Sequence, residues 1–212
     1  MQKKSNKNNI KWITVGMLLF FFTIIAIFVA TNKIHVFDNF VYGIISKIIN
    51  PTITSIVKVI TNFGDPIFIV IIGMIFSYIF GIRKKEKKTA IMFCLNLVIA
   101  ALLNFILKNI FVRTRPEIIN IITESGYSFP SGHSSIAMAC YGYIIYIINK
   151  KCDNKYVKII STICLSILIL LVGLSRVYLG VHFASDVIAA FCITLSYLII
   201  YTHLTESFSD KK

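Results

Sequence analysis

The segment SRVYLGVHFASD, residues 175–186, places a guanidinium, an imidazole and a carboxylate between two long apolar stretches. His182 and Asp186 are four residues apart, so on a helix they share one face and the carboxylate can orient the imidazole ring. A neutral imidazole held in one tautomer is a competent nucleophile toward phosphorus, and a neighbouring carboxylate stabilises the phosphohistidine that forms. The pair therefore predicts phosphoryl transfer, with a purely structural hydrogen bond as the simpler alternative.

A second histidine, His133, directly follows the tripeptide Pro130-Ser131-Gly132. Pro130 and Ser131 are residue types favoured at helix starts, and Gly132 permits close approach of the backbone to a ligand. The free N–H groups of a helix N-terminus bind anions. We therefore expect this segment to bind phosphate, and we expect His133 to protonate the leaving oxygen as a general acid.

Three cations accompany these groups, namely Lys108, Arg115 and Arg176. Arginine offers paired N–H donors to phosphoryl oxygens, and lysine adds a point charge. Each could instead be an anchor whose charged end reaches the membrane interface. Because all three fall on the membrane face where basic residues are disfavoured, their convergence favours a bound anion.

These residues together resemble the three-part signature of the type 2 phosphatidic acid phosphatase family. The sequence supplies K-x6-RP at 108–116, PSGH at 130–133 and SR-x5-H-x3-D at 175–186, in order and without substitution. The resemblance implies metal-independent hydrolysis of lipid phosphates or diphosphates, without a cofactor. It also implies His182 as nucleophile, Asp186 as its partner, His133 as acid, and a phosphate-binding set of Lys108, Arg115, Ser131, Gly132 and Arg176.

The substrate and the class of protein leave alternatives open. The short chain looks like bacterial members of the family, which favours undecaprenyl diphosphate or phosphatidylglycerol phosphate, with phosphatidic acid also open. Vanadium haloperoxidases resemble these sites but are soluble. A non-catalytic membrane protein that binds phospholipid or transports anions would need the arginines but not His133, His182 and Asp186 at these spacings.

The chain that must position these residues is strongly apolar. Of its 212 residues 57% are hydrophobic and 15% are charged, which excludes an ordinary soluble globular protein. Six segments approach the roughly 20 residues that a helix needs to cross a bilayer; they are 12–30, 65–82, 89–107, 131–149, 157–175 and 183–204. The sequence therefore predicts an all-α polytopic membrane protein with one domain over 1–212 and the catalytic signature within 108–186.

The connection between the first two predicted spans, residues 35–65, repeats apolar residues at helical spacing. Asn50 and Pro51 interrupt the pattern, which predicts two short amphipathic helices at the outer interface. A seventh spanning helix is disfavoured because four residues would all need burial, namely Asp38, Lys47, Pro51 and Lys58.

The net charge of +13 reports topology rather than a nucleic-acid partner. Most basic residues precede the first span, join the second to the third and the fourth to the fifth, or end the chain: Lys3, Lys4, Lys7, Lys11, Arg83, Lys84, Lys85, Lys87, Lys88, Lys150, Lys151, Lys155, Lys158, Lys211 and Lys212. The positive-inside rule makes these segments cytoplasmic, so both termini are inside and the site is outside. The expected partners are the bilayer and a lipid phosphate; the oligomeric state is open.

Three polar residues lie outside the signature. Arg113 could hold a second phosphate or anchor the chain at the interface, and both interpretations stay open. Asn96 and Asn104, inside the third predicted span, are expected to bond neighbouring helices rather than substrate.

Overall fold

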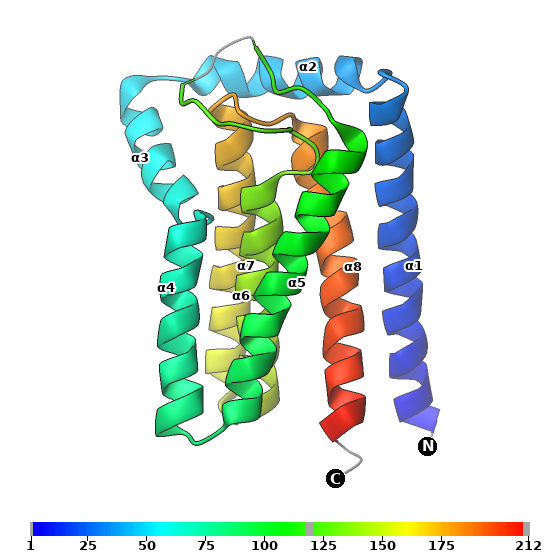
Figure 1. The fold of residues 1–212 in the computed structure, drawn as a ribbon, viewed down its shortest axis with the longest axis vertical. Helices are drawn as coiled ribbons and strands as arrows, with labels where there is room; N and C mark the ends of the chain where they lie inside the picture. The colour runs from blue at the N-terminus through cyan, green and yellow to red at the C-terminus, as the bar shows by residue number, and fades with distance from the viewer. Residues whose placement is uncertain (1, 118–120, 210–212) are drawn as a thin grey trace.

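The structure, a computed structural model, describes residues 2–117 and 121–209, and its regular secondary structure within these ranges is entirely helical. The helices are α1 (Gln2–Ala30), α2 (His35–Ile45), a 3-10 turn η1 (Ser46–Ile48), α3 (Pro51–Asn62), α4 (Pro66–Ser77), a π-helical turn η2 (Tyr78–Arg83), α5 (Lys87–Phe111), α6 (Gly132–Lys151), α7 (Lys155–Tyr178) and α8 (Ala184–Ser209). The long helices run along one axis, and α2 lies across one end of the bundle (Figure 1).

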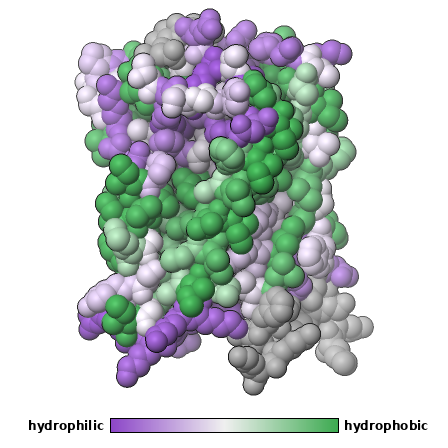
Figure 2. Space-filling view, viewed as in Figure 1, coloured by the Kyte–Doolittle hydropathy of each residue, from purple (hydrophilic) through white to green (hydrophobic). Residues whose placement is uncertain are grey.

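Among the described residues, five segments are long and apolar enough to cross a membrane, namely Asn9–Ala30, Pro66–Arg83, Lys87–Phe111, Lys155–Tyr178 and Ala184–Glu206. Helix α6 matches the fourth predicted span in length and position but carries more polar residues. It tolerates them because it packs against α5, α7 and α8 inside the bundle. On the face shown in Figure 2, an apolar band lies between two hydrophilic ends. The predicted all-α membrane fold is confirmed.

Two short helices occupy the connection between α1 and α4, as predicted, but the expectation that both lie at the interface is wrong for α3, since only α2 lies across the end of the bundle. Asn50 caps α3 through its side chain, which accepts a hydrogen bond of 2.9 Å from the Ile53 N–H, and Pro51 takes the first helical position. The chain bends by 119° at this break. Helix α2 therefore covers the end of the bundle, whereas α3 descends alongside α7 toward α4.

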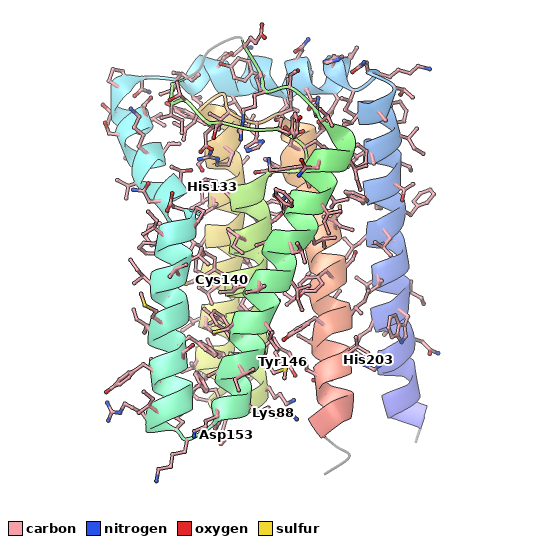
Figure 3. The ribbon with its side chains drawn as sticks, in the orientation of Figure 1. Lys88, His133, Cys140, Tyr146, Asp153 and His203 are labelled. Atoms are coloured by element: carbon pink, nitrogen blue, oxygen red, sulfur yellow. The ribbon has the colours of Figure 1, made fainter. Side chains whose placement is uncertain are left out.

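Both chain ends lie at the end of the bundle opposite α2 (Figure 1). Lys88 and Asp153 lie at that end, and His133 lies near the α2 end (Figure 3). Two carboxylates there pair with lysines: Glu86 with Lys151, and Glu206 with Lys11 at 3.6 Å. Lys211 and Lys212 lie outside the described residues. The basic clusters that the sequence assigned to one side thus gather at one end as far as the structure describes them.

Helices α4, α5 and α6 are joined through an aromatic core. The fully buried Phe93 ring stacks on Phe76 with centroids 4.1 Å apart and meets Tyr143 edge-on. Nearby, the Asn96 amide donates to the Ala139 carbonyl at 2.9 Å, the interhelical bond predicted for this residue. These contacts set the axial register of α5 against α6, and therefore the position of the residues at their α2 ends.

Candidate active site

A cavity of about 500 Å³ opens at the α2 end of the bundle, within the range typical of small-ligand sites. Residues from all three signature segments line it: Lys108, Arg115, Gly132, His133 and His182. Its remaining wall is largely apolar and comes from α4, α5 and the first turns of α6. Five of the eight predicted site residues thus face one space.

His182 lies between α7 and α8 with its two ring nitrogens in different surroundings. The Nη1 of Arg115 is 3.2 Å from Nε2, while Ser128 Oγ and Asp186 Oδ2 are 3.2 and 3.5 Å from Nδ1. A guanidinium can only donate, so Nε2 must be the acceptor and the ring proton belongs on Nδ1. This is the tautomer that leaves the Nε2 lone pair facing Arg115 and the cavity.

Burial lowers the pKa of His182 to about 4, against the opposing effect of the Asp186 carboxylate. Its side chain is 2% exposed, and Lys108 and Arg115 further disfavour a positive ring. The imidazole is therefore neutral near pH 7, which is the form that a nucleophile requires.

Asp186 is held from three sides. Its carboxylate accepts hydrogen bonds from Ser128 Oγ at 2.5 Å, from the Phe183 N–H at 2.9 Å and from Arg113 Nη1 at 2.6 Å. The carboxylate side chain is fully buried. Ser128 therefore bridges the predicted histidine–carboxylate pair, and sequence reasoning missed it although it stands two residues before Pro130.

Four hydrogen bonds hold the start of α6, which carries His133. The Asn104 amide donates to the Pro130 carbonyl at 3.2 Å and to Ser135 Oγ at 3.1 Å. Ser131 is fully buried: its hydroxyl accepts from Ser134, and its N–H donates to the Asp186 carbonyl at 3.2 Å. Asn104 thus bonds a neighbouring helix as predicted, and Ser131 joins two signature segments rather than lining the cavity.

Arg176 is 1% exposed and lies behind the cavity wall. Its guanidinium donates to Thr61 Oγ1 at 2.6 Å and to the carboxylate of Glu124. Glu124 lines the cavity, and its other oxygen lies 3.8 Å from Arg115 Nη2. A carboxylate therefore occupies the space between two arginines that were expected to bind phosphate.

The charge of Glu124 is maintained by these neighbours. Burial alone would raise its pKa, but the adjacent Arg176 guanidinium outweighs burial and holds the pKa of Glu124 below its usual value. The carboxylate is thus ionised near pH 7 and competes with any other anion for both arginines.

Arg113 fits neither of the roles left open for it. Its guanidinium lies between two carboxylates, with Nη2 2.7 Å from Asp38 and Nη1 2.6 Å from Asp186. It also packs 4.0 Å above the ring of Phe183. It is therefore not an interface anchor. It does not line the cavity either, so it is not placed to bind a second phosphate there. The sequence signal for this pairing was Asp38, an isolated acid in an apolar segment.

Comparisons with known proteins identify the family of the chain. The family model described as PAP2 superfamily matches residues 89–209. Phosphatidylglycerophosphatase B of Bacillus subtilis (strain 168) is 33% identical over 197 residues, covering 92% of this chain and 94% of that protein.

Two solved structures share the fold. The first transmembrane PAP2 type phosphatidylglycerolphosphate phosphatase from Bacillus subtilis superposes with a TM-score of 0.80 at 32% identity, covering 92% of this chain and 96% of that one. Aquifex aeolicus LpxE, at 23% identity and a TM-score of 0.58, covers 77% of this chain and 93% of its own. Since the family model matches more than half of the chain and the Bacillus relative nearly all of it, the chain belongs to the PAP2 superfamily and is a multi-pass membrane phosphatase.

Proposed function

We propose that the protein hydrolyses a lipid phosphate through a phosphohistidine intermediate, with phosphatidylglycerol phosphate as the favoured substrate. The observation that carries the proposal is the composition of the cavity. His133, His182, Lys108 and Arg115 line its polar end, and apolar residues of α4 and α5 line the rest. Such a cavity suits a molecule with a phosphate at one end and hydrocarbon at the other.

In the first step the Nε2 lone pair of His182 attacks phosphorus. The bond from phosphorus to the lipid oxygen breaks, and its electron pair stays on that oxygen, which takes a proton from His133; the negative charge of the bound phosphate favours the protonated ring that this step requires. Arg115 and Lys108, which line the cavity, offset the charge that develops on the phosphoryl oxygens, and Arg176 joins them where the phosphate displaces Glu124. Asp186 and Ser128, on the Nδ1 side of His182, stabilise the ring while it carries the phosphoryl group.

In the second step water attacks the phosphorus of phosphohistidine. His133, now neutral, takes one proton from that water, the N–P bond breaks with its electron pair returning to His182, and orthophosphate leaves. Each histidine thus ends in its starting protonation state. The arginines and the lysine stabilise the phosphoryl charge as cationic hydrogen-bond donors, so we expect no metal requirement.

The walls of the cavity suggest how a lipid reaches the site. Val70 on α4 and Val98 on α5 line it, and both are about 60% exposed on the outer face of the bundle. In a bilayer that face meets hydrocarbon, so a lipid can enter sideways between α4 and α5 with its headgroup toward His182. The basic ends of the helices support a cytoplasmic location for both termini and an extracytoplasmic site.

The test is phosphate release by detergent-purified protein with a chelator present. The assay compares three lipids: phosphatidylglycerol phosphate, undecaprenyl diphosphate and phosphatidic acid. All three are needed because the polar end of the cavity does not by itself distinguish their headgroups. We expect the first to be hydrolysed fastest, as the name of the Bacillus relative suggests. A faster rate with another lipid would replace the substrate while leaving the chemistry in place.

His182→Ala and His203→Ala form the matched pair of variants. His203 lies at the opposite end of the bundle from His133 (Figure 3). We expect the first variant to lose turnover and the second to keep it. Lipid binding without phosphate release by the parent protein would instead favour the non-catalytic alternative.

A further inference from the structure

A buried row of three charges runs from α2 to the catalytic pair. Arg113 Nη2 lies 2.7 Å from Asp38 on α2, and Arg113 Nη1 lies 2.6 Å from Asp186 on α8. Both carboxylate side chains are fully buried, and that of Arg113 is 8% exposed. Charges so far from water interact strongly, so each member affects the others.

The net charge of this row depends on Asp38. Without Asp38, Arg113 and Asp186 would form a neutral pair. A neutral pair gives little stabilisation to the positive ring that His182 has when it carries the phosphoryl group. With Asp38 the row carries one net negative charge, and the guanidinium is shared between two carboxylates. The electrostatic attraction between the Asp186 carboxylate and a positive His182 ring is therefore stronger with Asp38 present than without it.

Asp38 also fixes the first turn of α8 directly. Its two carboxylate oxygens accept hydrogen bonds from the Ser185 N–H at 2.9 Å and from the Ser185 hydroxyl at 2.8 Å. Arg113 Nη1 donates to the same hydroxyl at 2.8 Å. Since Ser185 directly precedes Asp186, these bonds orient the backbone that carries the catalytic carboxylate.

From these contacts we infer that Asp38 and Arg113 are positioning residues for the histidine–carboxylate pair: they set the orientation and the effective charge of Asp186 and so favour phosphoryl transfer to His182. The inference rests on the proposed function, because it assumes that His182 accepts the phosphoryl group. Neither residue lines the 500 Å³ cavity. Their effect therefore falls on the chemical step rather than on substrate binding.

The experiment measures kcat and KM for Asp38→Asn, with Asp153→Asn as the control for loss of one carboxylate. Asp153 lies at the opposite end of the bundle (Figure 3). We expect Asp38→Asn to lower kcat about tenfold, with KM unchanged, and Asp153→Asn to match the parent. The single-turnover rate of radiolabelled phosphoenzyme formation, followed after alkaline quenching, should fall in parallel with kcat.

A double variant separates this role from simple structural support. Arg113→Met leaves Asp38 and Asp186 as two buried carboxylates without a cation, so kcat should fall further, by roughly a hundredfold. Adding Asp38→Asn removes one of them and restores a single negative charge. We therefore expect Asp38→Asn/Arg113→Met to be more active than Arg113→Met alone, whereas additive losses would contradict the inference.

Two further measurements keep the result decisive. If Asp38→Asn is recovered poorly, Arg113→Lys gives the same test, because one ammonium cannot bridge both carboxylates as a guanidinium does; kcat should fall with KM unchanged. His182→Ala is assayed in parallel. An inactive His182→Ala beside a fully active Asp38→Asn overturns this inference alone, and turnover by His182→Ala overturns the proposed function with it.

Discussion

Glu124 holds the position that a phosphate would take between two arginines. Its carboxylate contacts the Arg176 guanidinium and lies 3.8 Å from Arg115. An incoming phosphate must displace this carboxylate before it can bind both arginines. We therefore expect Glu124 to neutralise the two arginines while no phosphate is bound, and so to reduce their affinity for small anions.

Glu124→Gln should therefore bind phosphate analogues more tightly. The neutral amide oxygen still accepts a hydrogen bond from Arg176, but more weakly than a carboxylate does. We expect the inhibition constant for vanadate to fall about tenfold, equivalent to about 1.4 kcal/mol, as measured by phosphate release. Glu117→Gln, an exposed acid in the same segment, should leave it unchanged. Weaker vanadate inhibition in Glu124→Gln would show that Glu124 supports Arg176 instead of competing.

The neutral state of His182 can be tested by its titration. A free histidine has a pKa near 6.5, whereas burial lowers the pKa of His182 to about 4. The unfolded chain therefore takes up a proton between about pH 6.5 and 4 that the folded protein does not, so His182 makes the fold less stable as the pH falls through this range. It does not reduce stability above pH 6.5.

The corresponding measurement is nuclear magnetic resonance of the protein with isotope-labelled histidine. The signal that is missing from His182→Ala identifies the residue. We expect this signal to keep the chemical shifts of a neutral ring from pH 8 down to about 5. A midpoint near 6.5 would mean that water or a charge partner reaches the ring more freely than the contacts of His182 imply.

The signature residues could be predicted from sequence because their types and spacings are local. Gly132 and His133 begin a helix as expected, whereas His182 lies in the bend just before α8 and only Asp186 is on that helix, so the two meet at a four-residue spacing without sharing a helix face. Ser128, Glu124 and Asp38 could not be assigned, because each acts through residues 50 to 150 positions away in the chain. Their partners depend on how helices pack, and spacing along the chain carries no information about that.

At the scale of elements, the turn between α3 and α4 must pass very close to the start of α6. A Cβ atom placed on Gly64 would lie 2.5 Å from Val172 Cγ1 and 3.2 Å from both Cβ and O of His133. Glycine is therefore required for this approach. Tyr141 reinforces it by donating its hydroxyl to the Phe63 carbonyl at 2.6 Å.

Gly64→Ala should displace both α7 and the turn that carries His133. Overpacking of this kind costs about 1–3 kcal/mol, so the thermal midpoint in detergent should fall by several degrees. We also expect a lower kcat, because His133 moves relative to His182. Gly16→Ala on α1 is the matched control, since nothing lies within 4 Å of its new Cβ. An unchanged midpoint for Gly64→Ala would contradict the close packing.

The positions of the helices could be predicted within a few residues because a bilayer demands long apolar segments. Hydropathy also located the two short helices before α4, and Asn50 and Pro51 located the break between them. The 119° bend and the placement of α2 over the candidate catalytic residues could not be predicted from the sequence. They follow from the buried contacts of Asp38 and from apolar packing, which set where α2 rests.

For the whole molecule, the distribution of charge and the position of the cavity define two unlike ends. Lys88, Asp153 and the outer ends of α1 and α8 lie at one end, and His133 with the cavity that it lines lies toward the other (Figures 1 and 3). Basic segments are retained on the cytoplasmic side during insertion. In the proposed orientation, the same bias that places the lysines inside places the candidate active-site cavity outside, where we expect a lipid of the outer leaflet to reach it.

This orientation predicts which cysteines a membrane-impermeant maleimide can reach in intact cells. Cys152 follows α6 at the lysine-rich end and is partly exposed, so it should stay unlabelled until the membrane is permeabilised. Lys47→Cys places a thiol in η1, beyond the opposite end, at an exposed position. In a chain whose other cysteines are replaced by serine, this thiol should react before permeabilisation. The reverse labelling pattern would put the cavity in the cytoplasm, and the substrate would then have to come from the inner leaflet.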